Sequence, residues 1–143
     1  MVGYPGGSAT DIFARLCAER LAGSYAPSVV VDNRPGASAR LAVEAVRATN
    51  PDGTAVLCRP ESVLTITPHI HPATTRYNGL TDLTPVSAVA SVPFASCVAA
   101  SHPSRSIDDF LRWAEDQPEA PYSSPATGST PQLLAELLAK QFA

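Results

Sequence analysis

Two short loops rich in glycine, serine and threonine are the parts of this sequence best suited to binding a ligand. The first reads PGGSATD at residues 5–11, and the second reads SPATGSTP at residues 124–131. Each precedes a segment predicted to be helical, and a helix N-terminus presents unpartnered N–H groups and a partial positive charge. Such loops predict sites for a small anion, most naturally a carboxylate. The candidate ligand-binding residues here are Gly6, Gly7, Ser8, Thr10, Asp11, Ser124, Thr127, Gly128 and Ser129.

The same residues also have a purely structural interpretation, because glycine, serine and threonine commonly cap helices. Asp11 lies in the first helical turn, where an acid simply favours the helix dipole. Its carboxylate could instead fix the loop, or accept hydrogen bonds from a ligand's amino group or a bound water. Arg59 and Glu61, in the segment CRPES after a predicted strand, are further candidates. Arg59 either pairs with an acidic ligand or is an exposed loop arginine.

Signatures of other chemistry are missing from the sequence. There is no GxxxxGK[ST] or GxGxxG phosphate-binding pattern, no GxSxG nucleophile turn and no HExxH zinc site. His69 and His71 could chelate a metal only if an extended backbone placed both rings on one side, and no cysteine or carboxylate lies beside them in the sequence. We therefore expect a binding protein without a cofactor or metal rather than an enzyme.

The composition argues against nucleic acid as a partner and against a membrane-spanning segment. The 143 residues carry 10 Lys and Arg against 13 Asp and Glu, and no basic stripe exists that could neutralise a nucleic-acid backbone. No apolar run approaches the roughly 18 residues that a membrane-spanning helix needs, and the start MVGYPGG has no features of a signal peptide. Cys17, Cys58 and Cys97 lie far apart in apolar segments, which is typical of small buried side chains.

The two loops must be positioned by the elements around them, and these alternate in type along the chain. The alternation predicts an α/β fold with a mostly parallel sheet and flanking helices. Predicted helices cover residues 11–22, 38–49, 107–117 and the segment from Thr130 onward, with a short helix and a loop within 63–82. Predicted strands are residues 28–33, 54–58 and 121–124, with two more in 84–100.

Two of the predicted helices carry informative apolar patterns. Ser106 is the expected N-cap of the third helix, with Asp109 three residues later, and Thr130 is the expected N-cap of the last helix with Pro131 in its first turn. The last helix places four leucines on one face at the end of the chain, so we expect exposed apolar surface there. In the first helix the apolar face consists of Ile12, Phe13, Leu16, Cys17 and Leu21.

Five segments together resemble a known family. YPGGSATDIFARLCAERL, VVVDNRPGASARLAVEAV, PDGTAVL, TDLTPVSAVASVP and YSSPATGSTPQLLAELL occur in an order and spacing similar to the Bug-type extracytoplasmic solute receptors, which are the TctC-like binding proteins of tripartite tricarboxylate transport systems. The resemblance covers essentially the whole chain. It implies a periplasmic-binding-protein-like fold of type II, here incomplete, and a periplasmic location.

Receptors of this family close two lobes on small organic anions, such as di- or tricarboxylates, acidic amino acids or aromatic acids, and deliver them to membrane transporter subunits. By this resemblance, residues 1–95 are most of lobe 1 with its first strand largely missing, and residues 96–143 are the start of lobe 2. The loops at Gly6 to Asp11 and at Ser124 to Ser129 correspond to the family's two pincers on a ligand carboxylate.

The chain also departs from the family pattern. Arg40 replaces a common Asn, Gln132 replaces a common His, and Arg59-Pro60-Glu61 replaces a loop of small residues. The resemblance further implies truncation at both ends, so we expect weak or no ligand binding and a homodimer or domain swap through the truncated edge. Two alternatives stay open: a vestigial or interaction module without ligand binding, and a small α/β enzyme acting on a phosphorylated substrate.

Overall fold

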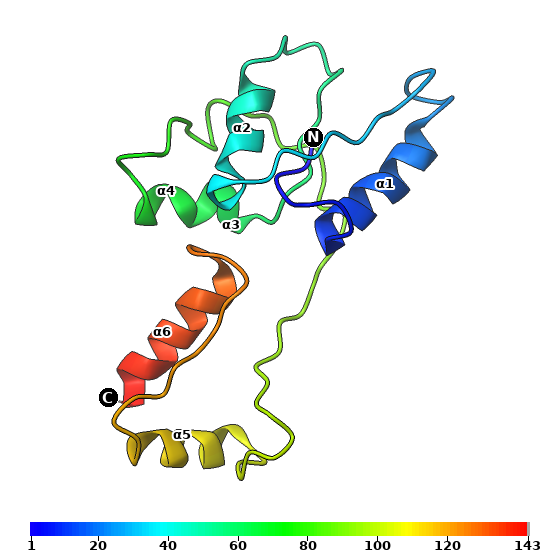
Figure 1. The fold of residues 1–143 in the computed structure, drawn as a ribbon. Helices are drawn as coiled ribbons and strands as arrows, with labels where there is room; N and C mark the ends of the chain where they lie inside the picture. The colour runs from blue at the N-terminus through cyan, green and yellow to red at the C-terminus, as the bar shows by residue number, and fades with distance from the viewer. Residues whose placement is uncertain (143) are drawn as a thin grey trace. The chain divides into compact units, whose positions relative to one another are not determined.

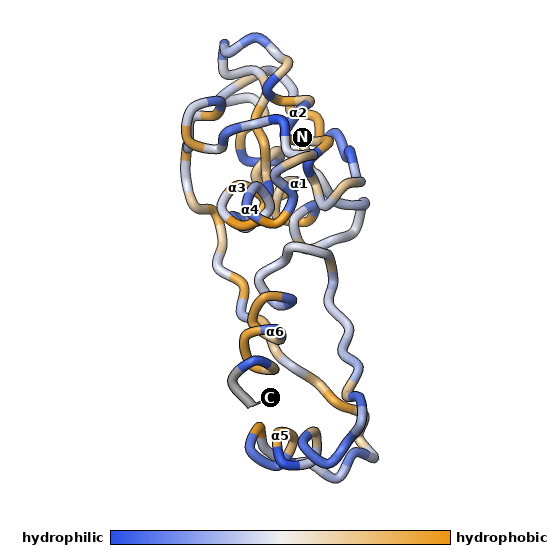
Figure 2. The backbone as a smooth tube through the Cα atoms, turned by 90° about the vertical axis from the view of Figure 1, so that its left-hand side faces the viewer, coloured by the Kyte–Doolittle hydropathy of each residue, from blue (hydrophilic) through white to orange (hydrophobic). Residues whose placement is uncertain are grey.

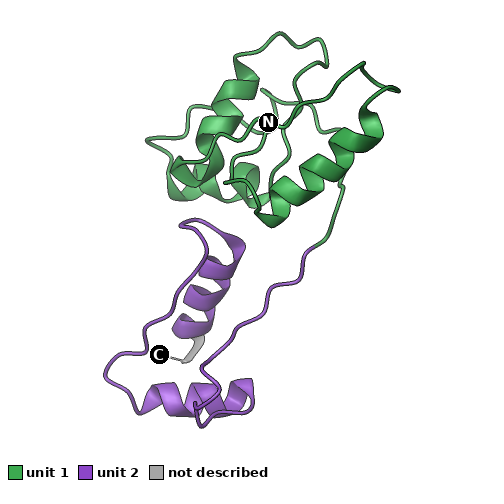
Figure 3. Cartoon of the chain, turned by 45° about the vertical axis from the view of Figure 1, so that its right-hand side comes forward, with its two compact units in different colours: residues 1–91 green, residues 92–143 purple. Residues whose placement is uncertain are grey.

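The computed structural model describes residues 1–142, and its regular structure is helical (Figure 1). The chain divides into two units, Met1–Ser91 and Val92–Ala143 (Figure 3). The helices of the first unit are α1 (Ala9–Leu21), the 3-10 turn η1 (Ala37–Ala39), α2 (Arg40–Arg47), α3 (Ser62–Thr65) and α4 (Thr67–Ile70). Those of the second unit are α5 (Ile107–Glu115) and α6 (Thr130–Phe142).

Serine caps fix the starts of two helices: the cap at Ser106 is the predicted one, whereas the helix after Ser8 begins two residues earlier than predicted. Ser8 Oγ accepts a hydrogen bond from the Asp11 N–H at 3.3 Å, and α1 begins at the next residue. Ser106 Oγ accepts one from the Asp109 N–H at 3.1 Å, and α5 follows. Both caps satisfy N–H groups that have no partner inside the helix. The last helix differs slightly from the prediction, because Thr130 is its first residue rather than its cap.

The predicted α/β fold with a mostly parallel sheet is wrong for this structure, because no β-strand forms within residues 1–142. Strand-type pairing is limited to three isolated bridges, two of which join Val2 in parallel to Asn33 and to Cys58. The Val2 N–H donates to Asp32 at 2.8 Å, and the Arg34 N–H donates to Val2 at 2.7 Å. The pattern is that of a parallel ladder, but it extends over a single residue.

The reason is a lack of backbone partners rather than of β-forming side chains. Residues 1–3 lie between the two segments that pair with Val2. After residue 3 the backbone turns at Pro5 and Gly7, so the pairing cannot continue. Residues 84–98 remain extended without any backbone–backbone hydrogen bond, although they are rich in valine. A strand exists only where a neighbour completes its N–H and C=O bonds, so propensity alone produces extended chain here.

The core of the first unit lies between α2, α3 and the segment around Tyr77. Ala39, Val43, Val63 and Tyr77 are buried and in contact, and the Tyr77 hydroxyl donates to the Val63 carbonyl at 2.6 Å. Around this cluster pack four partly buried side chains, those of Tyr4, Leu57, Leu64 and Leu83. Because Tyr4 precedes the first candidate loop and Leu57 precedes Arg59, this core supports both segments.

α1 buries a different face from the one its apolar residues indicate. Its buried residues are Asp11, Ala14 and Ala18, whereas Ile12 and Leu16 are 51% and 53% exposed. The polar contacts of Asp11 hold the helix in this rotation. The hydrophobic pattern therefore predicts the helix correctly but not the side that faces the unit.

A strained arc precedes α2. Ala37, Ser38 and Ala39 all have positive φ angles, of 49°, 54° and 68°, a region in which a Cβ atom is crowded. Arg40 Nε donates to the Ala37 carbonyl at 2.8 Å, and the Arg40 guanidinium also bonds to Thr74, so this side chain ties the arc to a second segment.

Replacing Ser38 by glycine is expected to stabilise the chain by about 0.5 to 1 kcal/mol, because removal of the Cβ relieves more strain than the added freedom of the unfolded chain offsets. Ser38→Ala is the matched control, because it deletes the hydroxyl but keeps the Cβ, and it should leave stability nearly unchanged. Urea denaturation followed by far-ultraviolet circular dichroism measures both. Equal stability of the two variants would show that the arc is not strained at this residue.

The second unit is organised around one aromatic cluster. The rings of His102, Phe110 and Trp113 lie with centroids 4.5 to 5.9 Å apart, and they join the segment before α5 to the helix itself. α6 is apolar along much of its length (Figure 2), and its Leu134 and Leu137 are 56% and 62% exposed. None of the helices in the described chain is long and apolar enough to cross a membrane.

Candidate functional site

The first candidate loop is a tight turn closed by the side chain of Asp11. Gly7 has a φ of 83°, which suits glycine, and its N–H donates to Asp11 Oδ2 at 2.8 Å. The Ser8 N–H donates to the Pro5 carbonyl at 3.2 Å, so the turn is bonded on both sides. Gly6 lies at the tip, where a Cβ would have nothing closer than Asp11 Oδ2 at 4.0 Å.

Asp11 is almost completely buried, with 2% of its surface exposed, and both of its carboxylate oxygens have protein partners. Oδ2 accepts from Arg15 Nε at 2.9 Å as well as from Gly7, and Oδ1 accepts from Asn33 Nδ2 at 2.8 Å. The hydrogen bond from Arg15 above all, with those from Gly7 and Asn33, holds the pKa of the Asp11 carboxyl well below its usual range. Of the roles open to Asp11, these contacts favour fixing the loop.

Asn33 links three parts of the first unit. Its Nδ2 donates to the Tyr4 carbonyl at 3.1 Å in addition to Asp11, and its Oδ1 accepts from Arg15 Nη2 at 3.2 Å. Asn33 and Arg15 were not among the candidate residues from the sequence. The available signal was the position of Asn33 at the end of a predicted strand, which is where a parallel sheet brings side chains together.

The free hydrogen-bond donors of this loop are on the helix that follows it. The N–H groups of Ala9 and Thr10 have no partner within the described chain, whereas those of Gly7, Ser8 and Asp11 are all used. Ala9 is exposed and Thr10 is half-buried. The start of α1 thus offers two adjacent backbone donors at the positive end of a helix dipole, which is an arrangement suited to one carboxylate.

Arg59 and Glu61 lie in the same unit as this loop. Cys58 Sγ is 3.9 Å from the carbonyl oxygen of Thr10, so the segment that carries Arg59 runs beside the start of α1. Arg59 is half-buried, its burial lowers the pKa of the guanidinium, and one of its Nη atoms donates to the Pro60 carbonyl at 2.9 Å. Glu61 is exposed, and its carbonyl accepts from the Leu64 N–H at 2.9 Å.

The second candidate loop is in the second unit and is closed in a similar way. Gly128 is buried with a φ of 76°, and its N–H donates to Gln132 Oε1 at 2.6 Å. The Ser129 N–H donates to the Ala126 carbonyl at 3.2 Å, and Ser124 Oγ donates to the same carbonyl at 3.4 Å. Thr127, the remaining candidate, is exposed.

Two kinds of polar group stay unpartnered at this second loop. Ser129 Oγ is buried and has no hydrogen bond within the described chain. The N–H groups of Thr130 and Gln132 at the start of α6 also have none there, and Pro131 between them has no N–H. A buried hydroxyl without a partner costs free energy, so Ser129 is a candidate for a contact that the protein alone does not supply.

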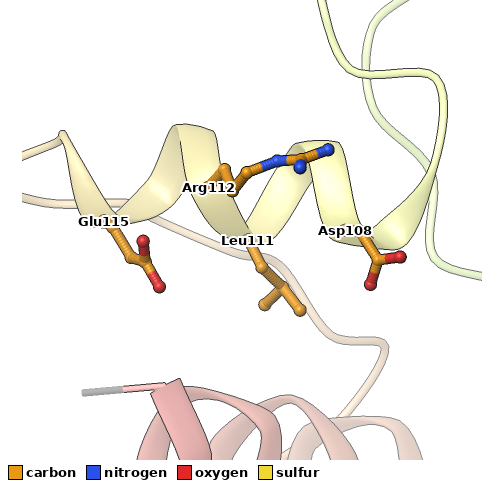
Figure 4. A pocket seen from close by; sticks show the side chains of 4 residues that line it. All are labelled: Asp108, Leu111, Arg112 and Glu115. Carbon is orange, nitrogen blue, oxygen red and sulfur yellow. The ribbon is translucent and has the colours of Figure 1, made fainter.

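The candidates therefore form one group in each unit. Gly6, Gly7, Ser8, Thr10 and Asp11 share the first unit with Arg59 and Glu61, whereas Ser124, Thr127, Gly128 and Ser129 belong to the second unit. A hollow beside α5, lined by Asp108, Leu111, Arg112 and Glu115, contains none of these residues (Figure 4). In residues 1–142 no group of three or more His, Cys, Asp or Glu side chains is placed to hold a metal, and His69 and His71 belong to no such cluster.

Comparison with known proteins assigns this chain to a family. Residues 13–143 match the tripartite tricarboxylate transporter family receptor, and the chain belongs to this family. The match confirms the resemblance to Bug-type, TctC-like receptors that the sequence motifs indicate. No solved structure matches the chain.

Curated relatives are similar over almost the entire chain. A UPF0065 protein of Bordetella bronchiseptica is 35% identical over 130 residues, which are 91% of this chain and 38% of that protein. Protein BugT of Bordetella pertussis is 32% identical over 143 residues, which are 96% of this chain and 42% of that protein. A UPF0065 protein of Cupriavidus necator is 29% identical over 142 residues. The chain thus spans about two fifths of the length of the relatives that it matches.

Proposed function

We propose that this chain is part of a periplasmic solute-binding receptor that takes a small organic carboxylate for a tripartite tricarboxylate-type transporter. The ligand is a di- or tricarboxylate, an acidic amino acid or an aromatic acid, and the chain binds it without catalysing a reaction. In this proposal residues 1–95 are most of one lobe and residues 96–143 are the start of the other. Membership of the transporter receptor family supports the general class.

The observation that carries the proposed binding mode is the set of unpartnered donors at two helix starts. The first helix offers the N–H groups of Ala9 and Thr10, and the last offers those of Thr130 and Gln132 beside the unpartnered hydroxyl of Ser129. A carboxylate has two oxygens and about four acceptor positions, so it can use the donors at either helix start. Arg59 follows Cys58, whose Sγ contacts the Thr10 carbonyl, and it adds a positive charge to the same unit.

The test is the thermal stability of the purified chain against succinate, citrate, glutamate and benzoate. A ligand that binds only the folded chain raises Tm with its concentration, and because the chain spans about two fifths of the length of its relatives we expect a small rise, at high ligand concentration, for at least one acid. The informative variant is Ala9→Pro, which removes one donor N–H at the first helical position, where proline is well tolerated. Ser8 already has the extended backbone, with φ −68° and ψ 159°, that a following proline requires.

Ala9→Gly is the matched control, because it changes the same residue but keeps the N–H. We expect Ala9→Pro to reduce the Tm shift by at least half and Ser129→Ala to weaken it, whereas Ala9→Gly should preserve it. Ser123, an exposed serine outside the candidate set, provides the control for Ser129, and Ser123→Ala should also preserve the shift. An equal shift in Ala9→Pro and Ala9→Gly would contradict binding at this helix. A folded wild-type chain that responds to none of the acids would contradict the proposed function.

Oligomeric state is recorded in the same experiment, because exposed apolar surface favours self-association. Leu134 and Leu137 of α6 are exposed, and residues 84–98 make no backbone–backbone hydrogen bond within the described chain. We propose that the chain forms a homodimer through such surface. A defined oligomer with no response to any acid would favour the alternative, an interaction module that has lost ligand binding.

A further inference from the structure

The two candidate loops share an arrangement of hydrogen bonds that extends from the glycine into the following helix. In the first, Gly7 donates its N–H to the side chain of Asp11, and in the second, Gly128 donates its N–H to the side chain of Gln132. Both glycines have positive φ, at 83° and 76°, and each acceptor lies four residues later in the first turn of a helix. A serine follows each glycine.

The correspondence continues one helical turn further. Asp11 pairs with Arg15, four residues on, at 2.9 Å, and Gln132 Nε2 donates to Glu136 Oε1, also four residues on, at 2.9 Å. Residues four apart are neighbours on one helix face, so each acceptor side chain is held in place by its own helix. In both loops the glycine, its acceptor and the partner of that acceptor therefore follow one another at intervals of four residues.

Each series of contacts is also bonded to a second segment of its unit. Asn33 donates to Asp11 Oδ1 at 2.8 Å in the first unit. In the second, the Tyr122 hydroxyl lies 3.4 Å from Glu136 Oε1 at hydrogen-bond geometry. The conformation of each glycine is therefore fixed both by its own helix and by a second segment of its unit. A preformed binding loop requires such support.

From this geometry we infer that Asp11 and Gln132 are equivalent positioning residues that hold the two carboxylate-binding loops in shape without contacting the ligand. The inference rests on the proposed function for the ligand, but the equivalence of the two residues stands on the contacts alone. The N–H groups of Gly7 and Gly128 are already bonded and are not ligand donors. The donors are the N–H groups that follow each glycine in the first helical turn.

The two acceptors differ in charge, and their partners differ accordingly. Asp11 is an anion close to the proposed site of another anion, and Arg15 balances its charge. Gln132 is neutral and donates to the acidic Glu136, so a second negative charge at this position would repel that side chain. Gln132→Glu should therefore keep an oxygen acceptor for the Gly128 N–H but lose the donor to Glu136 and place two carboxyl groups side by side.

The test follows the backbone amides of Gly7 and Gly128 by nuclear magnetic resonance in the chain without ligand. Gln132→Met has a similar volume but no oxygen acceptor, so the Gly128 amide proton should move upfield and exchange at least tenfold faster, while Gly7 is unchanged. Gln132→Glu, measured above the pKa of the new carboxyl, should restore the downfield Gly128 resonance. Gln117→Met, at the end of α5, is the matched control and should leave both amides unchanged.

Ligand binding is measured in the same variants with succinate, citrate, glutamate and benzoate. For any acid that binds the wild-type chain, Gln132→Met should weaken binding about tenfold, and Gln132→Glu at least as much, because no cation within the described residues balances its charge as Arg15 balances that of Asp11. If no acid binds the wild-type chain, the proposed function fails, but the Gly128 amide still decides whether Gln132 positions the loop. A folded Gln132→Met variant with an unshifted, equally protected Gly128 amide would overturn the inference.

Discussion

Replacing Asp11 by leucine is expected to lower the Tm of the chain by roughly 10 °C. Leucine has a similar size but accepts no hydrogen bond, so the Gly7 N–H and Arg15 Nε lose a close acceptor and Asn33 Nδ2 keeps only the Tyr4 carbonyl. The buried site does not let water replace the carboxylate freely, because Asp11 is 2% exposed. The first loop and the start of α1 should therefore loosen together.

The contribution of Asp11 depends on pH in a definite direction. Its pKa is lower in the folded chain than in the unfolded chain, where the value is about 4, so the carboxylate stabilises the fold fully above that pH. This stabilisation is lost as the pH falls from about 4 toward the lower pKa of the folded state. Asp11→Asn cannot ionise and lacks this component, so the difference in Tm between wild type and Asp11→Asn should narrow with acidification.

Comparison of wild type with Asp11→Asn separates the contribution of Asp11 to the pH dependence of stability from that of the other acids. The pKa values of Asp52, Asp82 and Asp109 are also lowered by local hydrogen bonds, but these residues are the same in wild type and in Asp11→Asn. Thermal melts at several pH values between about 2 and 7 measure the difference. A gap in Tm that stays constant over this range would show that Asp11 does not act through its charge.

The sequence predicts the helices of this chain well because their signals are local. Ser8 and Ser106 each lie three residues before the N–H group that they cap, and the cap at Ser106 forms as predicted. The strands could not be predicted in this way, because a strand depends on a neighbour that can be far away in sequence. Residues 84–98 have suitable side chains but no backbone partner within the described chain, and the predicted sheet is absent there.

The candidate loops could be located from sequence, but not the roles of their residues. Asp11 in a first helical turn looks the same in sequence whether it faces solvent or is buried, and only the contacts with Arg15 and Asn33 distinguish the two. A signal for Gln132 was available: GSATD and GSTPQ both begin with Gly-Ser and end with a side-chain oxygen acceptor at the fifth position. Only the hydrogen bonds of Gly7 and Gly128 show that this shared spacing places an acceptor on the glycine N–H.

Replacing Gly3 by alanine is expected to destabilise the first unit by about 3 kcal/mol. A Cβ at this residue would lie 2.3 Å from Ala39 Cβ and 2.8 Å from Ala39 Cα, so one of the two segments must move. Neither moves freely. Val2 is bonded through its N–H and carbonyl to Asp32 and Arg34, while Ala39 is packed in the core against residues that include Val43.

A second substitution, at Ala39, should partly relieve this clash. Ala39→Gly removes the atom at 2.3 Å and also suits the positive φ of residue 39, so the double variant should recover about 1 kcal/mol or more relative to Gly3→Ala alone. Gly6→Ala is the matched control, because its Cβ would meet nothing closer than Asp11 Oδ2 at 4.0 Å, and it should be nearly neutral. Urea denaturation followed by far-ultraviolet circular dichroism gives all four values of the cycle. Additive effects of the two substitutions would mean that Gly3 is required for a reason other than its contact with the strained arc before α2.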